Sequence, residues 1–205
     1  DFSKYKMALQ SVYRIEMTGK LAVPFSFLEQ FSYNGNSFLC KASIGRQWRW
    51  PSLNERFWQP GGNLHLNPEM SIGGDINFRI MHLINKWRFE LTQSAFIKNI
   101  KNWITWLPGA GAQAQVVNIN AVHNRGLESA IVIRKNFKRS EMEIAAQWNC
   151  AYTFTISNEN RFDINARGLQ WIYTPLYSGS GYLQCKTPYV LMQWQIMYTG
   201  YSYTS

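Results

Sequence analysis

The sequence has no run of about eighteen or more apolar residues, which excludes a membrane-spanning helix. It also lacks a helical periodicity of useful length, a CxxC pair, an HExxH segment and a nucleophile elbow. Its three cysteines, Cys40, Cys150 and Cys185, are spaced unlike a metal or redox site, so we interpret them as small apolar side chains on strands. The sequence indicates no metal and no cofactor.

The first ten residues, DFSKYKMALQ, lack the charged start and apolar middle of a signal peptide, and strand-like alternation already begins near Lys4. We therefore expect the sequence to start inside a fold. Acidic residues are scarce as well, because 12 Asp and Glu stand against 21 Lys and Arg, for a net charge of +9. The cations are dispersed, with KNFKRSE as the one local cluster, so we expect no nucleic-acid partner. The net positive charge is compatible with binding to anionic lipid, to lipopolysaccharide or to an anionic ligand.

Aromatic residues are abundant, at 16% of the 205 positions, and they fall into alternating segments typical of strands. In EMEIAAQWNCAYTFTIS (141–157) the apolar residues Met142, Ile144, Trp148, Tyr152 and Phe154 share one face. Glu141, Glu143, Gln147, Asn149 and Thr153 share the other. Similar segments lie at roughly 4–17, 21–33, 38–48, 71–82, 86–101, 125–137, 168–184 and 188–200. The pattern predicts about nine strands, many of them long enough to cross a bilayer at a tilt.

The connections between these segments alternate in length. Short joins are expected at 34–36, 83–85, 138–140 and 186–188, and long ones at 49–70, 102–124 and 157–167. An outer-membrane β-barrel has this pattern, with short turns at one rim, long loops at the other, a polar lumen and an apolar lipid face. A soluble, aromatic-rich carbohydrate-binding β-sandwich also alternates apolar and polar residues, although its strands are shorter. An odd strand number favours a piece of a larger barrel, because bacterial barrels close with even numbers.

The segment RWPSLNERFWQPGGNLHLNPEM (49–70) is far longer than a hairpin needs. With its flanking strands it resembles the signature of TonB-dependent outer-membrane receptors. The matching residues are Arg49, Pro51, Ser52, Leu53, Asn54, Trp58, Gly62, Asn63, Leu66, Pro68 and Glu69. Leu64 and Asn67 depart from the signature. Further matches, such as Asn118, Val122, Gly126 and Glu128, extend the resemblance from about Phe38 to Ser205, in the style of Bacteroidetes receptors.

The resemblance implies an all-β transmembrane antiparallel barrel, of which this chain is a partial section with about nine of about 22 strands. Residues 1–205 are then part of a single barrel domain, and the plug domain and the final strands are not recognised in the sequence. The implied function is outer-membrane import of a scarce nutrient: a metal-siderophore, a cobalamin-like compound or a glycan. The implied partners are the TonB–ExbB–ExbD system acting through the plug, outer-membrane lipid, lipopolysaccharide and a surface lipoprotein.

Within the long segment, the prolines and the pair Gly61-Gly62 are expected to fix its corners. The residues expected to offer stacking surfaces and donors to a bulky ligand are Arg56, Phe57, Trp58 and His65, with Trp103 and Trp106 from the next long loop. Packing of one loop on another would use the same residues. We expect Arg49 to end its strand and to bond to loop carbonyls or Glu69, and Trp58 to remain free for a ligand.

Enzymatic functions find little support in the sequence. His65, His82 and His123 lie far apart, and Glu141 with Glu143 fits a solvated lumen face better than an acid and base pair. We therefore expect no catalytic site. An outer-membrane phospholipase or protease is the enzymatic alternative.

Overall fold

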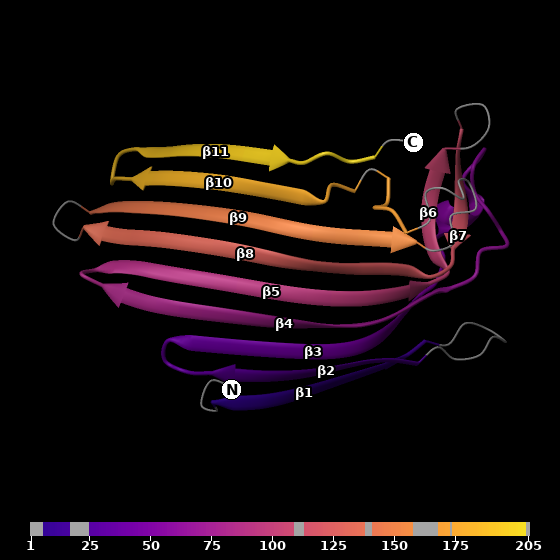
Figure 1. Cartoon of the computed structure of the whole chain (residues 1–205), viewed down its shortest axis with the longest axis horizontal. Coiled ribbons are helices and arrows are strands. Elements are labelled where there is room, and N and C mark those ends of the chain that lie inside the picture. Colours follow the sequence, from indigo (N-terminus) through magenta and orange to yellow (C-terminus); the bar gives the residue numbers. More distant parts are fainter. Residues whose placement is uncertain are drawn as a thin grey trace.

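Nine antiparallel strands form one continuous sheet in the order β1-β2-β3-β4-β5-β8-β9-β10-β11 (Figure 1). The structure, a computed structural model, describes residues 6–16, 25–108, 113–137, 141–157, 168–172 and 174–203. The strands of the sheet are β1 (Met7–Ile15), β2 (Phe25–Asn34), β3 (Phe38–Arg49), β4 (Glu69–Ile84), β5 (Trp87–Lys101), β8 (Val122–Phe137), β9 (Met142–Ser157), β10 (Tyr177–Lys186) and β11 (Leu191–Thr199). The expected sheet of about nine strands is confirmed, and the described residues do not form a two-layered sandwich.

Short turns lie at one end of the sheet and long connections at the other (Figure 1). Asn85 and Lys86 join β4 to β5 with φ values of 48° and 68°, as a tight two-residue hairpin requires. Thr187 to Val190 join β10 to β11. The segments 49–70 and 102–121 both lie at the opposite end, as expected. We call the two ends the turn end and the loop end. The expected loop at 157–167 lies, from residue 158, outside the described residues.

The segment 102–124 was expected to be a long connection without strands of its own, and this expectation is wrong. It contains a second, two-stranded sheet made of β6 (Trp103–Pro108) and β7 (Ala114–Ile119), which stands beyond the loop end of the large sheet (Figure 1). Buried apolar side chains on both strands, including Ile104, Val116 and Ile119, account for the hairpin. Strand β8 accordingly begins at Val122, three residues before the expected position.

The strand expected at 168–184 begins only at Tyr177, so its first part was also predicted wrongly. Residues 168–172 pair with β9 only in part: the Gly168 and Trp171 nitrogens donate to the carbonyls of Ser157 and Thr155, and the Gln170 side chain takes two further main-chain groups of β9. Its amide oxygen accepts from the Thr155 nitrogen at 2.9 Å, and its amide nitrogen donates to the Thr153 carbonyl at 3.0 Å. Because a side chain occupies the Thr153 carbonyl and the Thr155 nitrogen, residues 168–172 and 174–176 lie beside β9 with an isolated bridge at Gln170 and not as a continuous strand.

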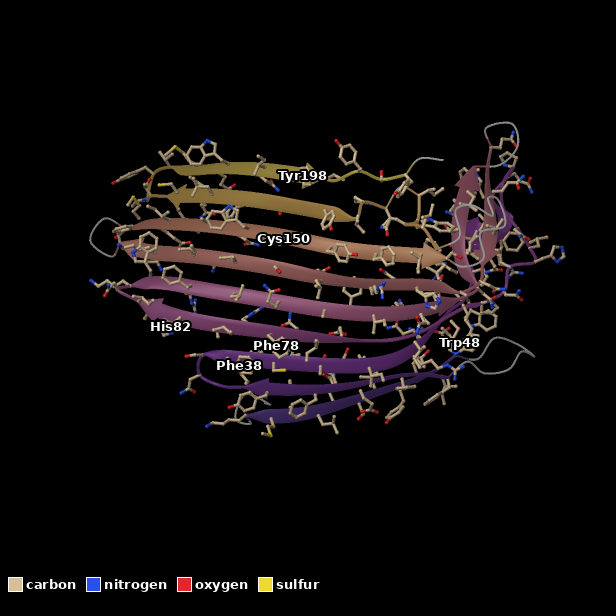
Figure 2. All side chains as sticks on the ribbon, in the orientation of Figure 1. Phe38, Trp48, Phe78, His82, Cys150 and Tyr198 are labelled. Atoms are coloured by element: carbon tan, nitrogen blue, oxygen red, sulfur yellow. The ribbon has the colours of Figure 1, made fainter. Side chains whose placement is uncertain are left out.

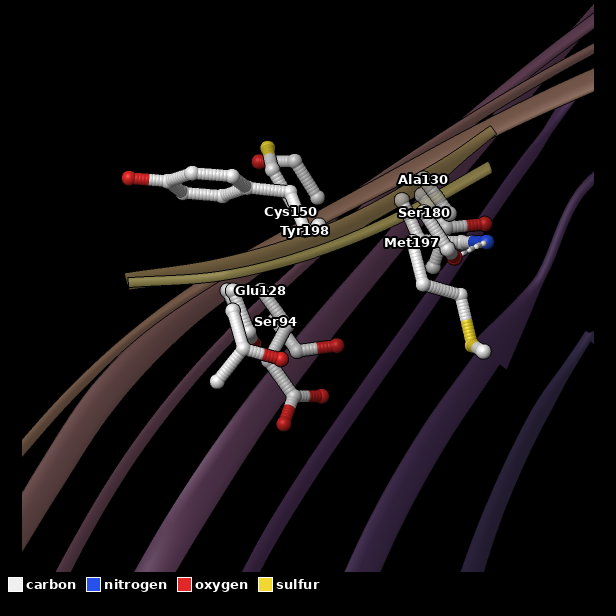
Figure 3. A pocket seen from close by; sticks show the side chains of 14 residues that line it. Ser94, Glu128, Ala130, Cys150, Ser180, Met197 and Tyr198 are labelled. Carbon is white, nitrogen blue, oxygen red and sulfur yellow. Dashed lines mark hydrogen bonds between the residues drawn. The ribbon is translucent and has the colours of Figure 1, made fainter. Parts of the chain in front are cut away.

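The sheet has an apolar face and a polar face, because the side chains of each strand alternate. On the apolar face Trp148 lies opposite Ile131 and Gly181, and Leu91 lies opposite Ile80 and Ile131. On the polar face Glu128 lies opposite Ser94, and the Asn149 amide donates to the Ser180 hydroxyl at 3.0 Å. Cys150 and Tyr198 lie on the other side of the sheet from Ser94 and Glu128 (Figure 3).

The expected two faces of β9 are confirmed, with one correction. Glu141 does not belong to the polar face of the strand, since it lies in the preceding turn with φ of 48°. The apolar face itself contains one acidic group, because Glu29 accepts hydrogen bonds from Ser11 and Tyr13 across β1 and β2. Elsewhere it carries large exposed apolar side chains over the whole sheet (Figure 2).

A buried apolar cluster lies at the loop end, where the large sheet meets the β6–β7 hairpin. It consists of Ile100, Leu107, Ile119, Val122 and Trp171. Because its members come from β5, both strands of the hairpin, β8 and the 168–172 segment, burial of their apolar surface fixes the hairpin on the sheet. No helix among the described residues is long and apolar enough to cross a membrane.

Candidate ligand-binding site

The segment between β3 and β4 begins with a short helix, α1 (Leu53–Phe57), which a capping box defines. The Ser52 hydroxyl accepts from the Glu55 nitrogen at 3.3 Å, and the Glu55 carboxylate accepts from the Ser52 nitrogen at 2.7 Å. Pro51 precedes the cap, and the Asn54 carbonyl accepts from the Trp58 nitrogen at the end of the helix. The helix has no buried residue, and Leu53 points to solvent. Its shape therefore depends on polar contacts at its ends.

Arg49, the last residue of β3, joins this helix to the start of β4. Its guanidinium donates to both Glu55 carboxylate oxygens at 3.0 Å and to Glu69 at 3.1 Å. The expected Arg49–Glu69 pair is confirmed, and Glu55 is a second partner. Burial acts to raise the pKa of Glu55, but hydrogen bonds from the Ser52 nitrogen and Arg49 outweigh it and lower that pKa. Glu69 also accepts from the Ile104 nitrogen of β6, so one carboxylate ties three elements together.

The expected corner at Gly61-Gly62-Asn63 is present and contacts the β6–β7 hairpin. The Gly61 carbonyl accepts from the Val116 nitrogen at 3.0 Å, and a Cβ on Gly61 would lie 2.1 Å from the Ala114 carbonyl oxygen. Only glycine permits this approach of two main chains. The Gly62 nitrogen donates to the Trp58 carbonyl at 2.6 Å, and the Asn63 amide donates to the Val116 carbonyl at 3.3 Å.

Asn118 on β7 holds the other end of the segment. Its amide oxygen accepts from the Asn67 nitrogen at 2.8 Å, and its amide nitrogen donates to the carbonyls of Asn67 at 3.1 Å and Asn102 at 2.7 Å. Asn102 in turn donates to the Pro68 carbonyl at 3.4 Å. These contacts join residues 58–69 and the hairpin into one unit, which we call the cap: residues 50–69 together with β6 and β7.

Four of the six expected ligand residues lie exposed on the 50–69 segment of the cap. Phe57 and Trp58 are 54% and 57% exposed, and the Arg56 guanidinium lies over the Phe57 ring at 5.1 Å. His65 is exposed, and its main-chain nitrogen donates to the Asn63 side chain at 2.9 Å. Two aromatic rings, a guanidinium and an imidazole are thus displayed by one segment of defined shape.

The two tryptophans of the hairpin, Trp103 and Trp106, have a structural role. Trp103 packs against the buried cluster and meets Trp171 edge to face, with ring centroids 5.1 Å apart. Trp106 is 40% exposed, and its ring lies against Gly61, where an added Cβ would be 3.0 Å from it. Both residues support the cap, and Trp106 also leaves part of its ring open to solvent.

Sequence reasoning missed Glu55, Asn118 and Trp171 as organising residues. For Glu55 the signal was present, because Ser52-Leu53-Asn54-Glu55 has the serine and glutamate spacing of a capping box. Asn118 was noted only as a matching position, and Trp171 gave no signal, since its partners come from distant segments. In the described part of the chain, no three His, Cys, Asp or Glu side chains are grouped as metal ligands.

The antiparallel sheet has one apolar and one polar face, with short turns at one end and an ordered cap at the other. This arrangement is that of the wall of a membrane β-barrel. The chain belongs to the family described as "TonB dependent receptor-like, beta-barrel", whose model matches residues 16–205. Among solved structures, the copper transporter OprC is similar, with 14% identity and a TM-score of 0.60. The match covers 91% of this chain and 31% of that chain, so the present chain spans about a third of its relative. A comparison with curated proteins gives no match.

Proposed function

We propose that this chain forms part of the wall and the external cap of an outer-membrane receptor that binds a scarce nutrient and imports it with TonB-transduced energy. The observation that supports this proposal most directly is the structure of the cap. Ion pairs of Arg49 and hydrogen bonds of Asn118 fix its shape, yet Arg56, Phe57, Trp58 and His65 remain on its surface. Rigid display of aromatic rings and donors lowers the entropic cost of binding a bulky ligand.

The proposed cargo is a metal-siderophore, a cobalamin-like compound or a glycan. Each offers flat or apolar surface for stacking on Trp58 and Phe57, together with acceptors for Arg56. OprC is named as a copper transporter. Its similarity to this chain is a similarity of fold, so we propose no copper site here.

In this proposal residues 1–205 belong to a single barrel domain in the bacterial outer membrane. The apolar face meets outer-membrane lipid and lipopolysaccharide, and the polar face lines the lumen. A hollow lined by residues such as Thr92, Glu128 and Asn149, drawn in Figure 3, would then open toward the lumen. TonB with ExbB and ExbD would act through a plug domain, and a surface lipoprotein would meet the cap from outside. The family match supports a receptor over an enzyme.

The test uses the complete receptor and three probes: a ferric siderophore, cyanocobalamin and an oligosaccharide. We expect one probe to bind, and Trp58→Ala to weaken that binding about tenfold, since a stacked aromatic pair is worth about 0.5–1.5 kcal/mol beyond area burial. Tyr189→Ala is the matched control, because Tyr189 is an exposed aromatic (94%) at the turn end. Its binding should be unchanged. Failure of all three probes to bind, or equal losses in both variants, would show the proposal to be wrong.

A further inference from the structure

A hollow of about 480 Å³ opens on the polar face of the sheet at its turn end (Figure 1). Its volume lies in the range of small-molecule sites, about 300–1,000 Å³. Its lining includes Lys86, Arg88, Arg134, Asn36, Asn136 and Glu143. Arg88 lies six positions from Ser94 on β5 (94 − 88), and Arg134 lies six positions from Glu128 on β8 (134 − 128), so both arginines share the polar face with those residues. We call this feature the turn-end hollow.

Two arginines face each other in this hollow. The register places Arg88 on β5 directly opposite Arg134 on β8, and both residues are exposed. Like charges in directly opposite positions destabilise a sheet, and the Cβ atoms of such a pair lie only about 4.5–5.5 Å apart. Lys86, in the tight turn between β4 and β5, adds a third exposed cation beside them. The two guanidiniums are therefore placed to reach a single anion that would relieve their repulsion.

The acidic residues near the turn-end hollow have other partners or are too few. Glu90, the acidic residue of β5, accepts from the Arg79 guanidinium at 3.2 Å. Glu143, the one carboxylate in the lining, lies opposite Lys186 of β10. Within the part of the chain that the structure describes, neither of the two opposed arginines forms an ion pair. The hollow therefore holds three cations and one carboxylate, and its positive charge is not neutralised by the described residues.

The side chains of the hollow match one ligand chemistry. A guanidinium donates two parallel hydrogen bonds to a carboxylate or a phosphate, and a lysine ammonium serves as a point charge for the same groups. The amides of Asn36 and Asn136 add neutral donors and acceptors for the remaining polar atoms of a ligand. A metal cation would be repelled by the net positive charge, and a neutral sugar would leave that charge uncompensated.

We propose that the turn-end hollow binds a small molecule that carries carboxylate or phosphate groups. Arg88 and Arg134 hold one such group between their guanidiniums, and Lys86 contributes the third positive charge. The inference deepens the proposed function and rests on it: short turns lie at the periplasmic rim of an outer-membrane barrel, so the hollow lies where imported cargo leaves the lumen. Cargo of this class meets aromatic rings on the cap and guanidiniums at the exit.

The test uses the complete receptor in detergent and two probes, citrate and inorganic phosphate, with binding measured by titration calorimetry. We expect at least one probe to bind, and Arg88→Gln and Arg134→Gln each to weaken that binding about tenfold, since each removes charge-assisted hydrogen bonds. Binding of citrate alone would assign the site to carboxylates, and binding of phosphate alone would assign it to phosphates. Lys98→Gln is the matched control, because Lys98 is a cation of the same polar face near the loop end, opposite Gly73 and Asn124. Its binding should equal that of the unmodified receptor.

Three results would overturn the inference: no binding of either probe, unchanged binding in both arginine variants, or an equal loss in the Lys98→Gln control. An acidic segment of the plug is the competing occupant of the hollow. It predicts that neither probe binds and that Arg88→Gln lowers hydrogen-exchange protection in the plug, and this outcome would also overturn the inference.

If the glutamine variants do not fold, as judged by heat-modifiable migration, Arg88→Lys and Arg134→Lys are measured in their place. These variants keep the charge but lose the paired hydrogen bonds, so a loss of about threefold is expected and unchanged binding would count against the site. The three cargo probes are measured in parallel. Cargo binding without binding of citrate or phosphate would refute this inference alone, and the reverse would refute the proposed function alone.

Discussion

Arg49 is the residue on which the shape of the cap depends most directly. It ends β3 and contacts two carboxylates, one on α1 and one at the start of β4, so it connects the two strands that the long segment separates. The Arg49 side chain is 43% exposed whereas the two carboxylates are nearly covered, at 12% and 13%. Removal of the arginine therefore leaves two poorly solvated negative charges, which costs more than the loss of a surface ion pair.

We expect Arg49→Gln to lower the free energy of local opening of residues 52–63 by about 1–2 kcal/mol, because part of each ion pair is screened by solvent. Hydrogen exchange on the complete receptor measures this opening. Arg56→Gln serves as the control, since Arg56 lies in the same segment and forms no ion pair among the described residues. Equal protection of residues 52–63 in both variants would contradict the role assigned to Arg49.

The lowered pKa of Glu55 predicts a pH dependence of the cap. A carboxyl whose pKa is lower in the folded state stabilises that state at pH values above its unfolded pKa of about 4.3, and this contribution is lost as the pH falls below that value. Protection of the Asn63 amide, which donates to the Glu55 carbonyl, should stay constant from pH 7 to about pH 5 and fall below about pH 4.3. After correction for intrinsic exchange, Glu55→Gln should show a flat profile over this range.

At the scale of elements, the cap is held to the sheet in two different ways. The β6–β7 hairpin is fixed by the buried cluster around Trp171, whereas residues 58–69 are held to the hairpin by hydrogen bonds, a close main-chain approach and the Trp106 ring against Gly61. Asn118 provides two of these contacts, both to Asn67, and a third hydrogen bond from the same side chain reaches the Asn102 carbonyl. Its loss should therefore separate the long segment from a hairpin that itself remains folded.

We expect Asn118→Ala to destabilise residues 61–68 by about 1–3 kcal/mol, because three hydrogen bonds are lost and the main-chain groups become accessible to water. Hydrogen exchange should show less protection there, with no change in β8 and β9. Asn67→Ala is a close control, since Asn67 contributes main-chain groups and not its side chain to these bonds. A uniform loss of protection across the large sheet would argue against a separable cap.

For the whole molecule, the two faces of the sheet decide where a charge can be placed. Trp148 lies midway along β9 on the apolar face, and its neighbour Gln147 lies on the polar face opposite Val132 and Tyr182. If the sheet lies in the outer membrane as proposed, a cation at position 148 faces lipid and a cation at position 147 faces the lumen.

Trp148→Arg should therefore impair barrel assembly by about 2–4 kcal/mol, and Gln147→Arg should have little effect. Heat-modifiable migration of the complete receptor in detergent measures the folded fraction of each variant. Folded fractions that are equal in the two variants would contradict the assignment of the faces.

The sequence by itself determined the strands, their two faces and the family, because a strand leaves a period of two in the sequence and because the 49–70 segment carries many matching residues in fixed order. It also determined the Arg49–Glu69 pair, which the signature places at the ends of adjoining strands. Tertiary structure alone decided the β6–β7 hairpin, the late start of β10 and the role of Trp103. Each of these depends on partners far along the chain: Trp171 for Trp103, the main chain of β9 for Gln170, and Gly61 with Val116 for the hairpin. Contacts between distant segments leave no periodic trace in the sequence, so only the folded chain brings them together.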